Sequence, residues 1–307
     1  MASPAKKKTT KNFPTFDAEL NETICDAYNN ADLTLTLKLG FRQINPAGGA
    51  ASGTYHDYGD ATETARNIVK WTPGSWSRWK TNFVSSAQRY WHGKFWLINN
   101  FPVLEFEDKG VKYRHNVYCR FKIIGADAAT GTHHHVIDVV RLAGSETFFG
   151  SHSTLYDSRD TVSTHKKTDS AGNKIMQRAH VHEIGHLLGL GHSAEGTSAC
   201  PTSGDTNASA CYGSSDSEMN SVMGGGMTLR ASHAYAWRMA IAAMTGKGTI
   251  RKPSDNRSWA ALANMLGTSY SEADFTSNDW EAMTKRHYPR TEAEVTANAA
   301  ITRRPSR

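Results

Sequence analysis

Residues 182–192 carry the pattern His-Glu-x-x-His-x-x-Gly-x-x-His, which constrains the local fold more than any other stretch of the chain. His182 and His186 are four residues apart, so a helix places both imidazoles on one face. Gly189 adopts the left-handed conformation at little cost, which suits the end of that helix. The chain then reverses and returns His192 toward the other two histidines. We therefore expect three imidazoles to point at one ion.

The residue types in this pattern are those of a catalytic zinc site. Neutral imidazole is a common zinc ligand, and three protein ligands leave a fourth position for water or substrate. Glu183 follows the first histidine and projects to its side, where a carboxylate serves as a general base rather than as a ligand. The alternative is a helix whose histidines meet this spacing by chance. The number of fixed positions favours the metal site, with Zn²⁺ as its cofactor.

The same residues resemble the active-site segment of the metzincin zinc peptidases. A second motif agrees, because Ser221-Val222-Met223-Gly224 lies where that family has its Met-turn. The resemblance makes Met223 an apolar floor beneath the three histidines. Ser193, directly after the third histidine, is similar to the matrixin branch. Gly225 stands where other branches place a tyrosine ligand, so no such tyrosine is expected.

The strict resemblance covers residues 182–192 and 221–224, and the order of predicted elements extends it to about residues 75–250. It implies an α+β fold of the metzincin type. Such a fold has a twisted mixed β-sheet, a backing helix, an active-site helix and a Met-turn.

Hydrophobic periodicity predicts the remaining elements. Residues 32–39 alternate between apolar and polar side chains, which indicates a half-buried strand. Aromatic residues recur every three or four positions over residues 75–91, which predicts a helix with its aromatic face in the core. Further strands are expected at 95–98, at 117–124 and 136–142 as a hairpin, and at 148–156 as an edge for a substrate peptide. Further helices are expected at 174–188 with Asn173 as N-cap, 228–244, 258–266 and 277–286.

His133, His134 and His135 enter the second strand of the expected hairpin. Alternation sends the middle histidine to the opposite face from its neighbours. An accessory metal site is the alternative, but we interpret the three as exposed polar strand residues.

The net charge of +6 belongs to the two ends of the chain. Four lysines lie within the first 15 residues and three arginines within the last 12, and neither segment contains an acid, so the rest is close to neutral. This distribution argues against a nucleic-acid-binding face. No apolar run reaches the length of a transmembrane helix. We expect a disordered basic tail over 1–15, a catalytic domain over 16–250 with its core at about 75–250, a helical extension over 251–295 and a basic tail over 296–307.

Cys200 and Cys211 bracket a polar loop between the histidines and Met223, and we expect them to form a disulfide. The alternative is four free thiols in a reducing compartment, and a pairing of Cys25 with Cys119 stays open. Because the loop lies at the lip of the cleft, its order is expected to affect substrate handling more than zinc affinity.

These observations favour a zinc-dependent endopeptidase that acts on proteins or peptides, with a monomer assumed. The lysines near the N-terminus precede no apolar stretch, so a standard signal peptide is not expected. The resemblance implies action outside the cell. We therefore expect either a mature or trimmed form or export by a dedicated apparatus, and the second alternative would suit an effector or toxin. The alternatives are a cell-wall or small-peptide hydrolase with the same chemistry and an inactive binding module with the same fold.

Overall fold

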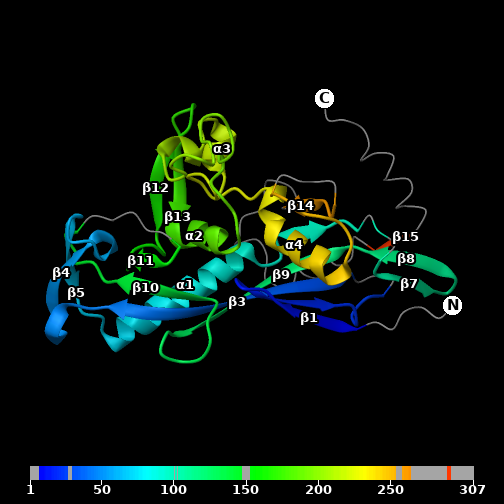
Figure 1. Ribbon diagram of the computed structural model, residues 1–307, viewed down its shortest axis with the longest axis horizontal. Coiled ribbons are helices and arrows are strands. Elements are labelled where there is room, and N and C mark those ends of the chain that lie inside the picture. Colours follow the sequence, from blue (N-terminus) through cyan, green and yellow to red (C-terminus); the bar gives the residue numbers. More distant parts are fainter. Residues whose placement is uncertain are drawn as a thin grey trace. The chain divides into compact units, whose positions relative to one another are not determined.

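The computed structural model describes residues 7–26, 30–99, 101, 103–146, 153–253, 258–263 and 289–291 (Figure 1). The chain divides into two compact units. Unit 1 comprises the segments up to Thr36, 91–122 and from Leu229 onward, and unit 2 comprises 37–90 and 123–228. Parallel and antiparallel strand pairs both occur beside a few helices, which confirms the α+β class.

Unit 2 contains the segment with the three histidines. The C-terminal part of β3 (Ala31–Ile44) pairs in parallel with β10 (His135–Val140), which in turn pairs in parallel with β11 (Leu155–Asp157). The C-terminal part of β9 (Val117–Asp127) is the other neighbour of β3. The rest of the unit comprises β4 (Ser52–His56), β5 (Ala65–Val69), α1 (Pro73–Trp91), β12 (Ser163–Thr168), β13 (Lys174–Arg178), α2 (Ala179–Leu187), α3 (Asp216–Asn220) and short 3₁₀ turns at Ala47–Gly49, Asp57–Gly59 and Ser209–Tyr212.

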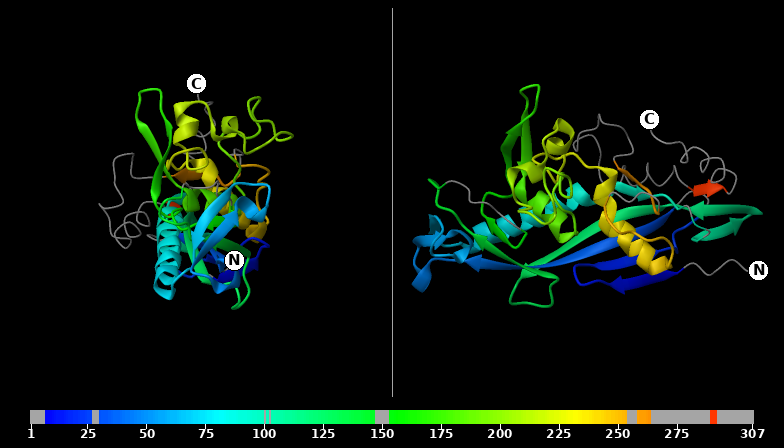
Figure 2. Two further views of the ribbon diagram at one scale, coloured as in Figure 1. Left: turned by 90° about the vertical axis from the view of Figure 1, so that its left-hand side faces the viewer. Right: turned by 45° about the horizontal axis from the view of Figure 1, so that its top comes forward.

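Helix α1 lies alongside β3 and β10, as both sets of views show (Figures 1 and 2). The predicted aromatic face of this helix is confirmed as core. Phe41 of β3 meets the rings of Trp79 and Phe83 edge-on, with centroid distances of 5.6 and 5.2 Å. Phe83 also contacts the His180 ring of α2 at 5.1 Å, and Ser86 Oγ lies 2.7 Å from His180 Nε2. The helix therefore connects the sheet to the element that carries two of the histidines.

Unit 1 is built mainly from antiparallel strands. Its strands are β1 (Lys8–Asn12), β2 (Asp17–Asn21), the N-terminal parts of β3 and β9, β6 (Phe95–Leu97), β7 (Glu105–Asp108), β8 (Val111–His115), β14 (Ala261–Ala263) and β15 (Pro289–Thr291). A 3₁₀ turn at Ala231–Ala234 leads into α4 (Tyr235–Thr245). Trp237 of α4 is fully buried and donates from Nε1 to Arg120 O at 2.9 Å.

Several predictions of secondary structure are wrong in the described residues. Lys8–Asn12 is not disordered but forms β1, because its backbone pairs with β2 while its side chains stay mostly exposed. The expected hairpin does not form, because β10 pairs in parallel with β3 rather than with β9. Ala261–Ala263 is not helical but pairs with β6 as β14. Residues 148–152 of the expected edge strand, 264–266, 277–286 and 296–307 lie outside the described residues.

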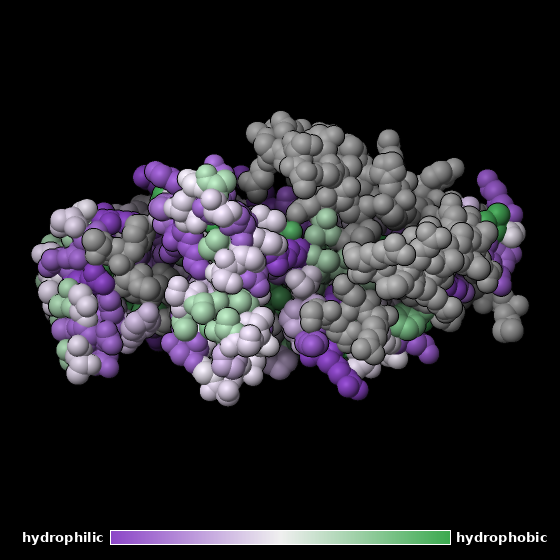
Figure 3. Space-filling view, turned by 90° about the horizontal axis from the view of Figure 1, so that it is seen from above, coloured by the Kyte–Doolittle hydropathy of each residue, from purple (hydrophilic) through white to green (hydrophobic). Residues whose placement is uncertain are grey.

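None of the helices in the described segments combines the length and the apolar character needed to cross a bilayer. On the face drawn in Figure 3, hydrophilic and weakly hydrophobic residues are interspersed, and the coloured surface carries no broad hydrophobic area.

Candidate metal centre

A β-hairpin leads directly into the helix with the first two histidines. Lys174–Arg178 forms β13, paired antiparallel with β12, so the predicted helix start at Lys174 is wrong. Burial alternates along this segment, with Ile175 and Gln177 inside, as a strand requires. Asn173 does not cap the helix but donates to Asp169 in the turn of the hairpin. Helix α2 begins at Ala179.

The end of α2 returns the chain toward its own histidines, as predicted. Gly189 has a φ of 81°, which is the left-handed conformation expected of it. Its N–H donates to His186 O at 2.9 Å, and the N–H of Leu190 donates to Gly185 O at 3.0 Å. These bonds satisfy carbonyls at the helix end and reverse the chain, which brings His192 beside the helix.

The structure brings the three predicted histidines together. One nitrogen of each of His182, His186 and His192 lies within 4.8 Å of the others, and no other group of this kind occurs in the described residues. The Nε2 atoms of His182 and His186 are 3.1 Å apart. Two nitrogens on a tetrahedral zinc ion, each at roughly 2.0–2.1 Å, lie about 3.3 Å apart. The spacing therefore fits a shared metal ion.

Each imidazole is oriented by a backbone carbonyl at its other nitrogen. The Nδ1 atoms of His182, His186 and His192 lie 2.7, 2.8 and 2.7 Å from Val222 O, Leu190 O and Thr206 O. A carbonyl only accepts, so each Nδ1 carries the proton and each Nε2 presents its lone pair. The buried Nε2 of His192 has no hydrogen-bond partner. Three lone pairs pointing at one another favour a cation between them.

Burial sets the protonation of the site. It is the main cause that lowers the pKa of His182 well below its usual value and that of His186 to about 4, so both are neutral at pH 7. Burial, with a smaller contribution from Asp160, raises the pKa of Glu183 to about 8, while Lys166 opposes the rise. A cation held by the histidines would favour the carboxylate form. Glu183 thus sits where a carboxylate can both take up and release a proton.

The segment with Met223 forms a buried turn behind the first histidine. Met223 is 1% exposed, and its carbonyl accepts from Ser193 N at 2.9 Å. Gly224 fits closely against α3, because a Cβ there would come within 2.2 Å of Glu218 O. The residues of the expected Met-turn are therefore packed against both the histidine segment and α3.

Gln177 of β13 holds this turn in place, a role that its sequence context did not reveal. Its side chain is buried, and Nε2 lies 3.1 Å from Val222 O and 2.9 Å from Gly224 O. The amide donates to both carbonyls, and one of them is the acceptor for His182 Nδ1. The sequence analysis placed Gln177 in the helix predicted over residues 174–188. That prediction gave no reason to expect a contact between Gln177 and the turn at Met223.

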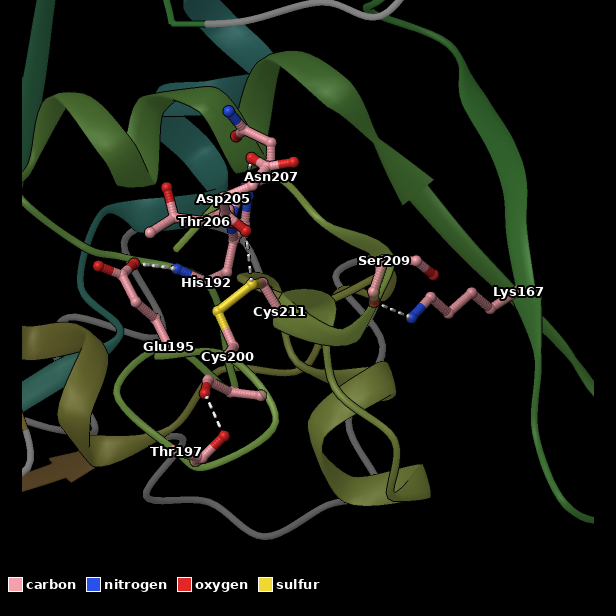
Figure 4. Close-up of a disulfide and its surroundings, with 11 residues drawn as sticks. Lys167, His192, Glu195, Thr197, Cys200, Asp205, Thr206, Asn207, Ser209 and Cys211 are labelled. Carbon is pink, nitrogen blue, oxygen red and sulfur yellow. Dashed lines mark hydrogen bonds between the residues drawn. A yellow bond between two sulfur atoms is a disulfide. The ribbon is translucent and has the colours of Figure 1, made fainter. Parts of the chain in front are cut away.

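The predicted disulfide between Cys200 and Cys211 is present (Figure 4). The loop that it closes contains Thr206, whose carbonyl accepts from His192. Tyr212 follows the second cysteine, and its ring centroid is 4.0 Å from that of His192. Cys25 and Cys119 are buried and form no disulfide, so the second pairing does not form.

A cavity of about 420 Å³ opens beside the histidines. Its lining includes Glu183, His186, His192, Glu195, Asn207 and Tyr212. The segment between His192 and Met223 was expected to shape the pocket, but Glu195 and Tyr212 were not singled out within it, because only the folded loop brings them to the cavity.

The His133–His135 segment does not form a second metal site in the described part of the chain. His134 Nδ1 accepts from Lys38 N at 2.9 Å. His133 packs closely on Gly40, where a Cβ would come within 2.5 Å of the ring. The three histidines are half-buried rather than exposed, because they pack against β3.

Comparisons with protein-family models, with curated proteins and with solved structures find no match for this chain.

Proposed function

We propose that the protein is a zinc-dependent endopeptidase of the metzincin type. The observation that carries the proposal is the convergence of three Nε2 lone pairs, each fixed by a carbonyl at Nδ1, beside the buried carboxylate of Glu183. The cavity leaves this group open to a ligand, unlike a closed structural zinc site. The spacing of the histidines and the buried turn at Met223 support the metzincin assignment.

Zinc bound by the three imidazoles supplies Lewis acidity toward a peptide carbonyl and toward water. Glu183 accepts the proton of the attacking water and later donates it to the nitrogen of the leaving amine. A cation held by the histidines favours the carboxylate form of Glu183, which is the form that can accept a proton from water. The carbonyls of Val222, Leu190 and Thr206 keep the imidazoles in the tautomer that presents Nε2.

The Cys200–Cys211 disulfide favours an oxidising compartment, so we propose that the protein acts outside the cytosol. Its substrates would be proteins or peptides. A cell-wall or small-peptide hydrolase would use the same chemistry, and the experiment includes an arm for it.

The test compares zinc-loaded wild type with Glu183→Ala on a denatured proteome, with mass spectrometry of the cleavage products and of the bound zinc. Glu107→Ala is the control, because it removes an exposed carboxylate of β7. We expect Glu183→Ala to retain zinc and to lose roughly 10²–10⁴-fold in turnover. Turnover within tenfold of wild type at equal zinc content would contradict the mechanism. Hydrolysis of peptidoglycan fragments but not of proteins would favour the cell-wall hydrolase.

A further inference from the structure

A second carboxylate lines the cavity that Glu183 and the histidines border. Glu195 lies three residues beyond His192, and its side chain reaches the same cavity as His186 and Asn207. Among the described residues, the lining contains no lysine or arginine. Glu183 is assigned to proton transfer, so Glu195 is the carboxylate of the lining that can pair with a positive charge on a ligand.

The Glu195 side chain is exposed, and its carboxylate is oriented by the backbone of the histidine segment. Its Oε2 accepts from the backbone N–H of His192 at 3.1 Å, as Figure 4 shows. The carboxylate lies so close over Gly191 that a Cβ there would come within 2.0 Å of Oε2. Glycine at this position therefore leaves room for the charge. An oriented carboxylate loses little conformational entropy when it binds a partner.

Lys166 and Lys167 are two basic residues whose recorded interactions are with groups other than Glu195. Lys167 is engaged elsewhere, because its Nζ donates to Gly213 O at 3.1 Å and lies 5.9 Å from the centroid of the Tyr212 ring. Lys166 acts on Glu183, whose pKa it lowers. Both lysines come from β12 and neither lines the cavity.

We propose that this cavity binds a cationic group of the substrate beside the scissile bond, with Glu195 as its counter-charge. The inference rests on the proposed peptidase function and adds the class of substrate. Two sources share this chemistry, namely a lysine or arginine side chain and a free terminal amine. The oriented carboxylate, in a lining whose described residues include no lysine or arginine, favours either of these over an acidic or apolar group.

The experiment begins with peptides that zinc-loaded wild type cleaves in a proteome digest. The best-cleaved peptide is resynthesised with lysine, methionine or glutamate at each position flanking the cut, with free and acetylated N-termini. Cleavage rates are measured for wild type and for Glu195→Gln, which keeps an acceptor for His192 N and removes the charge. Glu107→Gln is the control for the loss of one exposed carboxylate. Binding of the same peptides to zinc-loaded Glu183→Ala, with and without Glu195→Gln, gives a readout that does not depend on cleavage.

We expect lysine to exceed methionine by about fivefold in kcat/KM and in affinity at one position, the value of a partly exposed ion pair. Glu195→Gln should abolish that preference, and Glu107→Gln should leave it unchanged. A preference that acetylation removes assigns the cation to the terminal amine, and one that survives assigns it to a side chain. Equal rates for lysine, methionine and glutamate, insensitive to acetylation, would overturn this inference alone. Failure of wild type to cleave any peptide would instead contradict the proposed function.

Discussion

Replacing both Cys200 and Cys211 by serine should weaken zinc binding about 10- to 100-fold, the usual effect of losing a group that orients a metal ligand. The two cysteines are 11 residues apart. In the chain-entropy model, a disulfide that closes a loop of this size lowers the conformational entropy of the unfolded chain by an amount worth about 3 kcal/mol. Thr206 lies inside the loop, and its carbonyl is the acceptor 2.7 Å from His192 Nδ1. Without the disulfide, that carbonyl no longer has a fixed position.

This expectation revises the one from sequence, which assigned the loop to substrate handling rather than zinc affinity. The revision follows from a backbone carbonyl, which no side-chain pattern reports. The 3.4 Å contact from Cys211 Sγ to Asp205 O adds to the connection between the disulfide and Thr206.

The assay is competition for zinc between the protein and a chromophoric chelator. Cys119→Ala is the control, because it removes a buried free thiol outside the loop. We expect the double serine variant to release zinc at a lower chelator concentration while the control behaves as wild type. A zinc dissociation constant within twofold of wild type in the double variant would refute the role given to the closed loop.

Three further predictions concern single residues. Gln177→Leu should lower the free energy of unfolding by about 1–3 kcal/mol, because it removes the amide that donates to the carbonyls of Val222 and Gly224, and it should weaken zinc binding. Gln88→Leu, compared with it in the same urea titration, should leave zinc affinity unchanged. Met223→Leu should cost less than about 1.5 kcal/mol in the same titration and retain zinc, whereas zinc loss as complete as in His186→Ala would contradict a packing role. Burial lowers the pKa of His233 to about 3, so its neutral form contributes stability that is complete above the unfolded pKa of about 6.5 and is lost as the pH falls toward 3. Between pH 7 and 5 wild type should therefore lose about 2 kcal/mol more than His233→Gln, and equal losses would show that this histidine is not the cause.

Local patterns predicted the elements whose residues are repeated at a regular spacing. The aromatic spacing of α1 and the alternation along β3 were sufficient, because each pattern reports one buried face. The pattern at His182–His192 likewise fixed the ligands and the glycine that ends α2. The start of α2 was missed because five residues of β13 alternate too briefly to be separated from the helix that follows.

Long-range pairings and backbone roles could not be predicted from the sequence. The parallel pairing of His135 with Leu39 joins residues far apart in the chain, while proximity suggested a hairpin with β9. Gln177 reaches the site from β13 and Glu195 from the loop after His192, and neither belongs to a recognisable motif. The carbonyl of Thr206 is invisible in any residue pattern, because every residue has one.

Anomalous diffraction at the zinc absorption edge from crystals of the zinc-loaded protein tests the central claim most directly. The account predicts one zinc ion at roughly 2.0–2.1 Å from Nε2 of His182, His186 and His192, with a non-protein group in the fourth position and Glu183 outside the ligand sphere. An anomalous peak elsewhere, such as at His133–His135, or a fourth ligand from the protein that closes the site would contradict it.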